Sequence, residues 1–96
     1  MARQYVKQIS PYQESAELLV QDGNSIAGNL IRGNAYQEAV AFLLALKERT
    51  AEDEHNLGLA FEATGEISQA RKHYETALKM DNNNPVFKAA LTRTIN

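Results

Sequence analysis

Apolar residues recur at helical spacing along nearly the whole chain from Ser10 onward, and this pattern limits the fold more than any other feature. The interruptions between these stretches carry residues that end and begin helices, not the turns that join strands. The sequence therefore predicts an all-α fold. Six short helices are expected, at about residues 11–22, 25–32, 36–49, 51–64, 68–80 and 85–94.

The expected helix boundaries rest on capping chemistry. Residues 50–53, Thr-Ala-Glu-Asp, have the spacing of a capping box, and residues 84–85, Asn-Pro, stop one helix and cap the next. Residues 22–24, Asp-Gly-Asn, disfavour helix at each position, so a break is predicted there; the alternative is one long helix through this segment. After the second helix, either Gly33 or Asn34 can adopt the left-handed conformation that ends a helix.

Helix pairs in this chain also repeat. Gly58 and Ala70 are small at the positions where two paired helices would touch, and Phe61 and Tyr74 are large enough to fill the volume beside them. This spacing closely resembles the tetratricopeptide repeat, a helix–turn–helix unit, over residues 51–84. The residues expected to form the packing pattern of the repeats are Ile26, Ala27, Leu30, Ala39, Leu43, Leu57, Gly58, Phe61, Gly65, Ala70, Tyr74 and Ala77.

The resemblance implies a short α-α superhelix. Besides the clear repeat, a degenerate repeat is expected at about 20–50, and residues 85–95 are either a capping helix or the first helix of a third repeat. Residues 1–10 are expected to be an extended or linker segment before a helical domain of residues 11–96. An array of two repeats is only marginally stable, because one helix pair cannot bury its own apolar face. End helices or a second copy of the chain must therefore cover that face. Self-association to a homodimer is therefore also predicted.

In tetratricopeptide arrays the first helices of successive repeats line a concave groove that binds an extended or helical segment of another protein. The resemblance therefore implies a non-catalytic protein–protein interaction module that needs no cofactor. Asn56 lies where family members that grip a peptide backbone often place an Asn; the alternative is a solvated helix residue. The positions carried over to the groove are Glu52, His55, Asn56, Leu59, Glu62, Ala63, Asn24, Ser25, Gly28, Ile31, Arg32, Ala89, Ala90 and Arg93.

These groove positions predict a mixed surface. Acidic, basic and apolar side chains alternate along it, which suits a neutral or amphipathic ligand segment. Some family members clamp a C-terminal carboxylate with several cations, and this chain departs from that pattern because Asn24, Ser25, Ala89 and Ala90 stand where those cations would be. Leu59 is assigned to the groove, so Leu59→Glu is expected to abolish partner binding and to leave helicity intact.

Composition argues against several other functions. Ten Lys and Arg against twelve Asp and Glu give a net charge of −2, which lacks the positive field that nucleic acid requires, and the absence of cysteine excludes thiolate metal sites and disulfides. The longest apolar run, residues 39–46, is far too short to cross a bilayer. Residues 52–55, Glu-Asp-Glu-His, fan out around a helix, so a metal site is not predicted and a solvated acidic first turn is expected. The sequence has no phosphate loop or nucleophile elbow and indicates no catalytic residue.

Two alternatives to the interaction module remain at this point. The chain is either a structural or homo-oligomerisation domain, or the tail of an exported bacterial lipoprotein, because residues 4–12 resemble segments found in such proteins. Residues 1–10 lack the apolar stretch of a secretory signal, so the compartment stays open. It is the cytoplasm or, if the chain is part of a larger exported protein, the periplasm.

Overall fold

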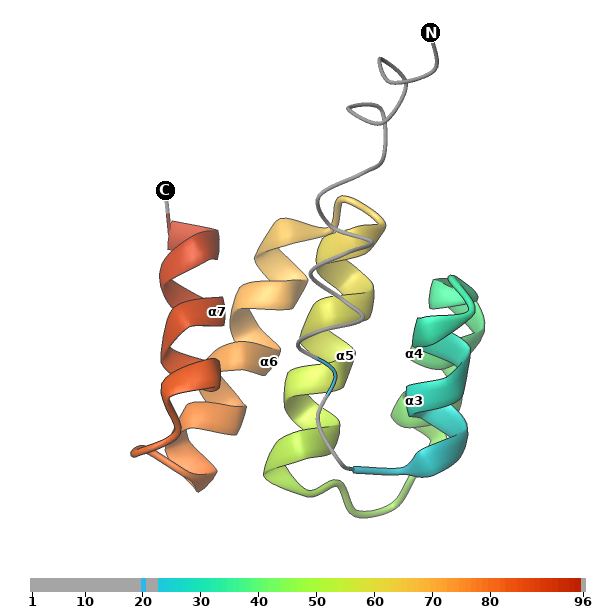
Figure 1. Ribbon diagram of the computed structural model, residues 1–96, viewed down its shortest axis with the longest axis horizontal. Coiled ribbons are helices and arrows are strands. Elements are labelled where there is room, and N and C mark those ends of the chain that lie inside the picture. The colour runs from blue at the N-terminus through green and yellow to red at the C-terminus, as the bar shows by residue number, and fades with distance from the viewer. Residues whose placement is uncertain (1–19, 21–22, 96) are drawn as a thin grey trace, which may run out of the picture.

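The computed structural model describes Val20 and residues 23–95 of the chain. Helices account for most of this part, and it contains no strand. The expected helix at 11–22 and the expected linker at 1–10 lie outside the described residues, apart from Val20. The helices are α3 (Ser25–Arg32), α4 (Tyr36–Ala45), α5 (Ala51–Ala63), α6 (Ile67–Met80) and α7 (Pro85–Ile95), shown in Figure 1.

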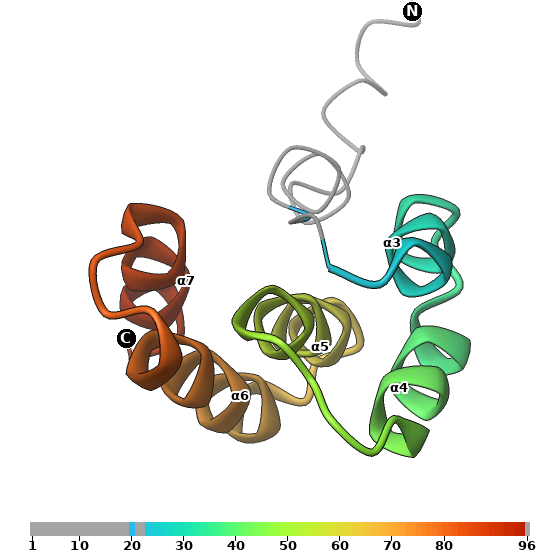
Figure 2. The same cartoon turned by 90° about the horizontal axis from the view of Figure 1, so that it is seen from below.

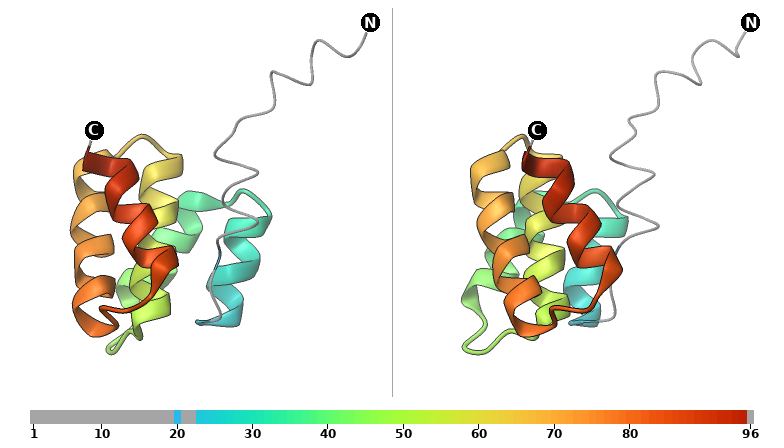
Figure 3. Two further views of the ribbon diagram at one scale, coloured as in Figure 1. Left: turned by 60° about the vertical axis from the view of Figure 1, so that its left-hand side comes forward. Right: turned by 90° about the vertical axis from the view of Figure 1, so that its left-hand side faces the viewer.

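Each helix packs against the next one along the chain, and α3 also contacts α5. Figure 2 shows that α3, α5 and α7 form one layer and α4 and α6 the other, so the helices alternate between two layers. Their axes are roughly aligned, with α7 tilted relative to α5 and α6 (Figure 3). The layer of α3, α5 and α7 curves around one side of the molecule, which we call the concave face. The expected all-α, repeat-like superhelix is therefore confirmed.

The capping predictions agree with the structure at each place where it describes them. The Thr50 side chain accepts from the Asp53 amide and the Asp53 side chain accepts from the Thr50 amide, both at 3.1 Å, which completes the capping box. The Asn84 side chain accepts from the first amides of α7. Asn24 is extended and caps α3, so no helix continues through it, and Asn34, at φ 66°, takes the left-handed position between α3 and α4.

Helix α4 is shorter than expected, because it ends at Ala45 and not near Arg49. Leu46 is extended, at φ −70° and ψ 138°, and the chain then turns toward the start of α5. The Arg49 side chain donates to the Leu43 carbonyl over 3.1 Å, which satisfies one of the carbonyls left open at the helix end. Tertiary contacts of the connection therefore override the helical propensity of residues 46–49.

Helix α5 lies at the centre of the fold and is buried around most of its circumference. A Cβ built on Gly58 would lie 2.5 Å from Tyr74 Cε1, so only glycine allows the Tyr74 ring to pack flat against α5. Ala77 of α6 and Phe87 of α7 belong to one buried apolar cluster. The small Ala77 side chain leaves room there for the Phe87 ring. Buried positions of the expected packing pattern are Ala27, Ala39, Leu43, Leu57, Gly58, Ala70, Tyr74 and Ala77, and Leu30 and Phe61 are partly buried.

Two members of that pattern do not pack in the interior. Ile26, in the first turn of α3, is 55% exposed, so its assignment to the packing pattern is wrong. Gly65 is exposed and acts through its backbone, because its φ of 89° allows the turn between α5 and α6.

Candidate functional site

The concave face is the surface that the sequence assigns to partner binding. Ile31 of α3, Leu59 of α5 and Ala90 of α7 belong to one buried cluster. Residues of the other layer, Ala39 of α4 and Tyr74 of α6, also contribute to it. Leu59 is 4% exposed. The prediction that Leu59 stands apart from the core is therefore wrong, because the side chain is covered and contributes to the main apolar cluster.

Glu62 and Arg93, both assigned to the groove, bind each other. Arg93 donates from Nε to Glu62 Oε2 over 2.9 Å and from Nη2 to Glu62 Oε1 over 2.8 Å. The Tyr74 hydroxyl donates to Glu62 Oε1 over 2.7 Å, and the Arg93 guanidinium lies 5.9 Å from the centre of the Tyr74 ring. Helices α5, α6 and α7 thus meet at one buried carboxylate, and the bidentate pair fixes the position of α7.

The protonation of this group of side chains follows from its surroundings. Burial, followed by the negative charge of Glu62, raises the pKa of Tyr74 well above its ordinary value. The hydrogen bonds to Glu62 raise the pKa of Arg93, against the opposing effect of burial. At neutral pH the cluster therefore holds a neutral phenol and an ion pair whose charges compensate each other.

The first turn of α5 is not the solvated acidic surface that the sequence predicts. Glu54 is 6% exposed, and its two oxygens accept from Arg49 Nε and pair with His73 Nδ1, each over 2.8 Å. The His73 ring stacks on Phe61, with centroids 5.5 Å apart and planes at 11°. Glu54 therefore joins the α4–α5 connection to α6, a role that requires three segments to meet and leaves no local pattern in the sequence.

Asp53 is the second buried carboxylate of this turn, at 5% exposure. Besides its part in the capping box, its Oδ1 accepts from the Asn24 amide over 2.7 Å. A Cβ at Gly23 would collide with the same oxygen. The chain just before α3 is therefore fastened to the N-terminus of α5.

His55 and Asn56 are fully buried, each at 0% exposure. The His55 ring stacks on Phe87 at a centroid distance of 5.1 Å and is tilted against Tyr74 at 5.4 Å. The alternative that Asn56 is a solvated residue is excluded by its burial. Its contact with a peptide backbone stays a prediction.

Most of the remaining groove positions keep some contact with solvent. Ser25, Arg32 and Ala89 are exposed, and Asn24, Glu52, Ala63 and Arg93 are partly buried, whereas Gly28 is buried. The structure thus brings the expected groove residues of three helices onto or beside one face. It also buries the central ones, which spacing along single helices does not reveal.

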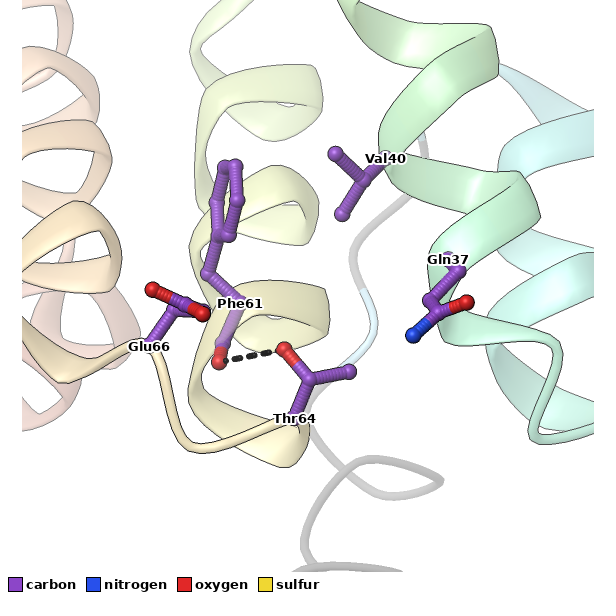
Figure 4. Close-up of a pocket in the computed structure, with 5 residues that line it drawn as sticks. All are labelled: Gln37, Val40, Phe61, Thr64 and Glu66. Carbon is purple, nitrogen blue, oxygen red and sulfur yellow. Dashed lines mark hydrogen bonds between the residues drawn. The ribbon is translucent and has the colours of Figure 1, made fainter.

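A separate pocket of about 270 Å³ opens between α4 and the turn after α5. Figure 4 shows Gln37 and Val40 of α4 facing Phe61 and Thr64 across it, with Glu66 at its edge. The Thr64 hydroxyl donates to the Phe61 carbonyl over 3.0 Å. The sequence did not indicate this pocket, which forms where α4 diverges from α5.

Within Val20 and residues 23–95, no group of three or more metal-ligating side chains comes together. Among the helices described, none is long and apolar enough to cross a membrane.

The clear helix pair matches a known family. Residues 51–84 fit the family model described as tetratricopeptide repeat. Residues 51–84 are a tetratricopeptide repeat. Within this tetratricopeptide repeat α5 is the first helix and α6 the second, and the Gly58–Tyr74 contact lies between them. Neither a curated protein nor a solved structure matches the chain. The repeat indicates a protein–protein interaction module, and the assignment of α3 and α4 to a degenerate repeat stays a prediction.

Proposed function

We propose that the chain binds a neutral or amphipathic segment of another protein on its concave face, between α3, α5 and α7. The single observation that carries this proposal is the arrangement of these helices in one curved layer beside a tetratricopeptide repeat. The face carries an exposed cation, Arg32, and a partly exposed carboxylate, Glu52, beside the buried apolar cluster of Ile31 and Leu59. A segment with an apolar stripe and charges of both signs is complementary to that surface.

The proposal is tested by NMR titration of the isotope-labelled chain with a panel of synthetic amphipathic helical peptides. Binding peptides are expected to shift the amide resonances of Arg32, Glu52 and Arg93, which the proposal assigns to the concave face. Shifts confined to the pocket around Gln37 and Thr64, or a panel without any binder, would contradict it.

A matched pair of charge reversals sharpens the test. Arg32→Glu changes an exposed residue of α3 beside the concave face, and Lys79→Glu changes an exposed residue of α6 in the other layer. Arg32→Glu is expected to weaken a binder with an acidic flank by about tenfold and Lys79→Glu to leave its affinity unchanged. Equal effects of the two variants would show that net charge, and not the concave face, governs binding.

A further inference from the structure

We infer that the chain has a second binding surface, outside the concave face, for an extended basic segment of another protein. The pocket between α4 and the turn after α5 is one half of this surface. A second pocket, of about 250 Å³, adjoins it, since Gln37 and Thr64 line both. We call the two together the α4 pockets. The described residues that line them include none of the positions assigned to the concave face, so binding there does not require that face.

The size of the α4 pockets favours amino-acid side chains as their occupants. Sites for small molecules usually enclose about 300–1,000 Å³ and bury most of the ligand. The α4 pockets are smaller, at about 270 and 250 Å³, and both are open to solvent. Alternate side chains of an extended segment point to the same side, so residues i and i+2 of one segment can enter one pocket each.

The first pocket combines an apolar wall with one carboxylate. Val40 and Phe61 form the wall, and both pack on their inner side against the buried apolar cluster that includes Leu43. Glu66 is exposed at the edge of the pocket, as Figure 4 shows. A Lys or Arg side chain matches this arrangement, because its aliphatic stem can cover the apolar wall while its charged end reaches the carboxylate.

The second pocket offers the same combination from other residues. Tyr36 is partly buried, and Glu38 is exposed. The Tyr36 hydroxyl donates to Asn34 Oδ1 over 2.8 Å, so its proton is engaged and its oxygen is left to accept. An ammonium or guanidinium group only donates hydrogen bonds, and it finds acceptors here in the Glu38 carboxylate and the Tyr36 oxygen. The two pockets therefore suit two cationic side chains.

The charges of the α4 pockets favour a basic segment over an acidic one. The described residues that line the pockets include two carboxylates, Glu38 and Glu66, and no cation. Within Val20 and residues 23–95, neither carboxylate takes part in an ion pair, whereas Glu54 and Glu62 are both paired. A basic segment would supply the missing partners, and an acidic one would bring like charges together.

Both carboxylates also lie at the start of a helix, which gives them a second role that a test must separate from binding. Glu38 is in the first turn of α4, and Glu66 directly precedes α6. Negative charge at these positions stabilises a helix through its dipole. That role accounts for the acidic residues and does not account for the apolar wall beside Glu66 or for the adjoining second pocket.

Binding is measured by NMR titration of the isotope-labelled full chain at low salt. The probe is the peptide Ala-Arg-Ala-Arg-Ala, blocked at both ends. The amides of Gln37, Thr64 and Glu66 are expected to shift, and the affinity should fall as salt is added. The blocked peptide Ala-Ala-Arg-Arg-Ala has the same charge but places its cations on opposite sides, so it should bind about threefold more weakly. Equal affinities, or shifts spread over the whole surface, overturn the inference.

A matched pair of double variants separates the α4 pockets from net charge. Replacing Glu38 and Glu66 together by Gln is expected to weaken Ala-Arg-Ala-Arg-Ala at least about tenfold. Replacing Glu48 and Glu75 by Gln makes the same change of charge at exposed positions outside the pockets and should leave the affinity within about twofold. Equal effects overturn the inference. So does a loss of thermal stability without a loss of affinity, because the carboxylates would then serve α4 and α6 alone.

Gln37→Lys tests the same surface without removing either carboxylate. Gln37 is exposed and lines both pockets, so a cation there should compete with the peptide and abolish its shifts. Thr76→Lys, at an exposed position of α6 outside the pockets, is the control and should bind as the unaltered chain does. Unchanged binding by Gln37→Lys overturns the inference. The probe has no apolar stripe and the variants leave the concave face intact, so a failure here does not bear on the proposed function.

Discussion

Tyr74 illustrates how one side chain serves two purposes at the residue scale. Its ring requires glycine at position 58, and its hydroxyl donates to the carboxylate that holds α7. In the unfolded chain a tyrosine ionises near pH 10, whereas burial and the charge of Glu62 raise the pKa of Tyr74 in the folded chain. Above about pH 10 the unfolded state therefore binds fewer protons than the folded state, and the free energy of unfolding falls with pH.

Tyr74→Phe is expected to reduce this alkaline loss of stability. One phenol contributes a slope of up to about 1.4 kcal/mol per pH unit to the free energy of unfolding, and the variant lacks this contribution. At pH 7 the variant also loses the hydrogen bond to Glu62, which costs about 1 kcal/mol. Urea unfolding between pH 7 and about pH 11 measures both effects. Tyr36→Phe is the comparison. Burial alone raises the pKa of the partly exposed Tyr36, so this variant is expected to reduce the alkaline slope less than Tyr74→Phe does. An unchanged alkaline slope in Tyr74→Phe contradicts the prediction.

Gly58 allows a second test at the same scale. A Cβ there would lie 2.5 and 2.6 Å from two carbons of the Tyr74 ring, so Gly58→Ala must move the ring or α5 and is expected to cost about 1–3 kcal/mol. At Gly33, φ is negative and an added Cβ would come no closer than 3.4 Å to the Asn29 carbonyl oxygen. Gly33→Ala should therefore be nearly neutral in denaturant unfolding. Equal costs for both substitutions would show that contact with the Tyr74 ring does not determine the result.

At the scale of the elements, the start of α5 is both a helix cap and an anchor for the chain before α3. Thr50→Ala removes one capping hydrogen bond and is expected to cost about 1 kcal/mol. Asp53→Ala also removes the acceptor of the Asn24 amide, so it should cost more and should raise the amide exchange rate of Asn24. Hydrogen exchange and urea unfolding distinguish the two variants. Equal costs and unchanged exchange at Asn24 would mean that Asp53 acts as a cap alone.

The elements also show what can be predicted from sequence. Capping residues such as Thr50 and Asn84 mark helix ends because their effect is local, and the Gly58–Tyr74 spacing indicates the helix pair for the same reason. The C-terminal end of α4 and the partners of Glu54 could not be predicted, because each depends on segments that meet only in the folded chain. Burial of Leu59 was missed for that reason too, since helical spacing assigns it to a face without telling what covers that face.

At the scale of the whole molecule, the ends and the concave face of a short array determine whether one chain can bury its own apolar faces or needs a second copy to do so. The sequence predicts self-association, because two repeats leave apolar faces uncovered. The structure buries the main apolar cluster within one chain, and the large apolar side chains that stay exposed, among them Met80 and Ile95, are distributed over different helices. We therefore expect a monomer. Light scattering over a wide concentration range measures this, and a mass that rises toward twice that of the chain would contradict it.

If the chain does form a dimer, the position of the contact shows which apolar surface the second copy covers. An open pocket between α6 and α7 is lined by Leu78 and Leu91 and carries Glu75 and Lys79, whose opposite charges allow two copies to pair across a twofold axis. If the chain dimerises there, Lys79→Glu should restore the monomer because it places like charges opposite each other. If it dimerises through the concave face instead, Lys79→Glu should leave the dimer intact and Val20→Asp should disrupt it. In that case the apolar cluster around Leu59 is completed by a second copy, and the domain is an oligomerisation unit, not a monomeric binding module.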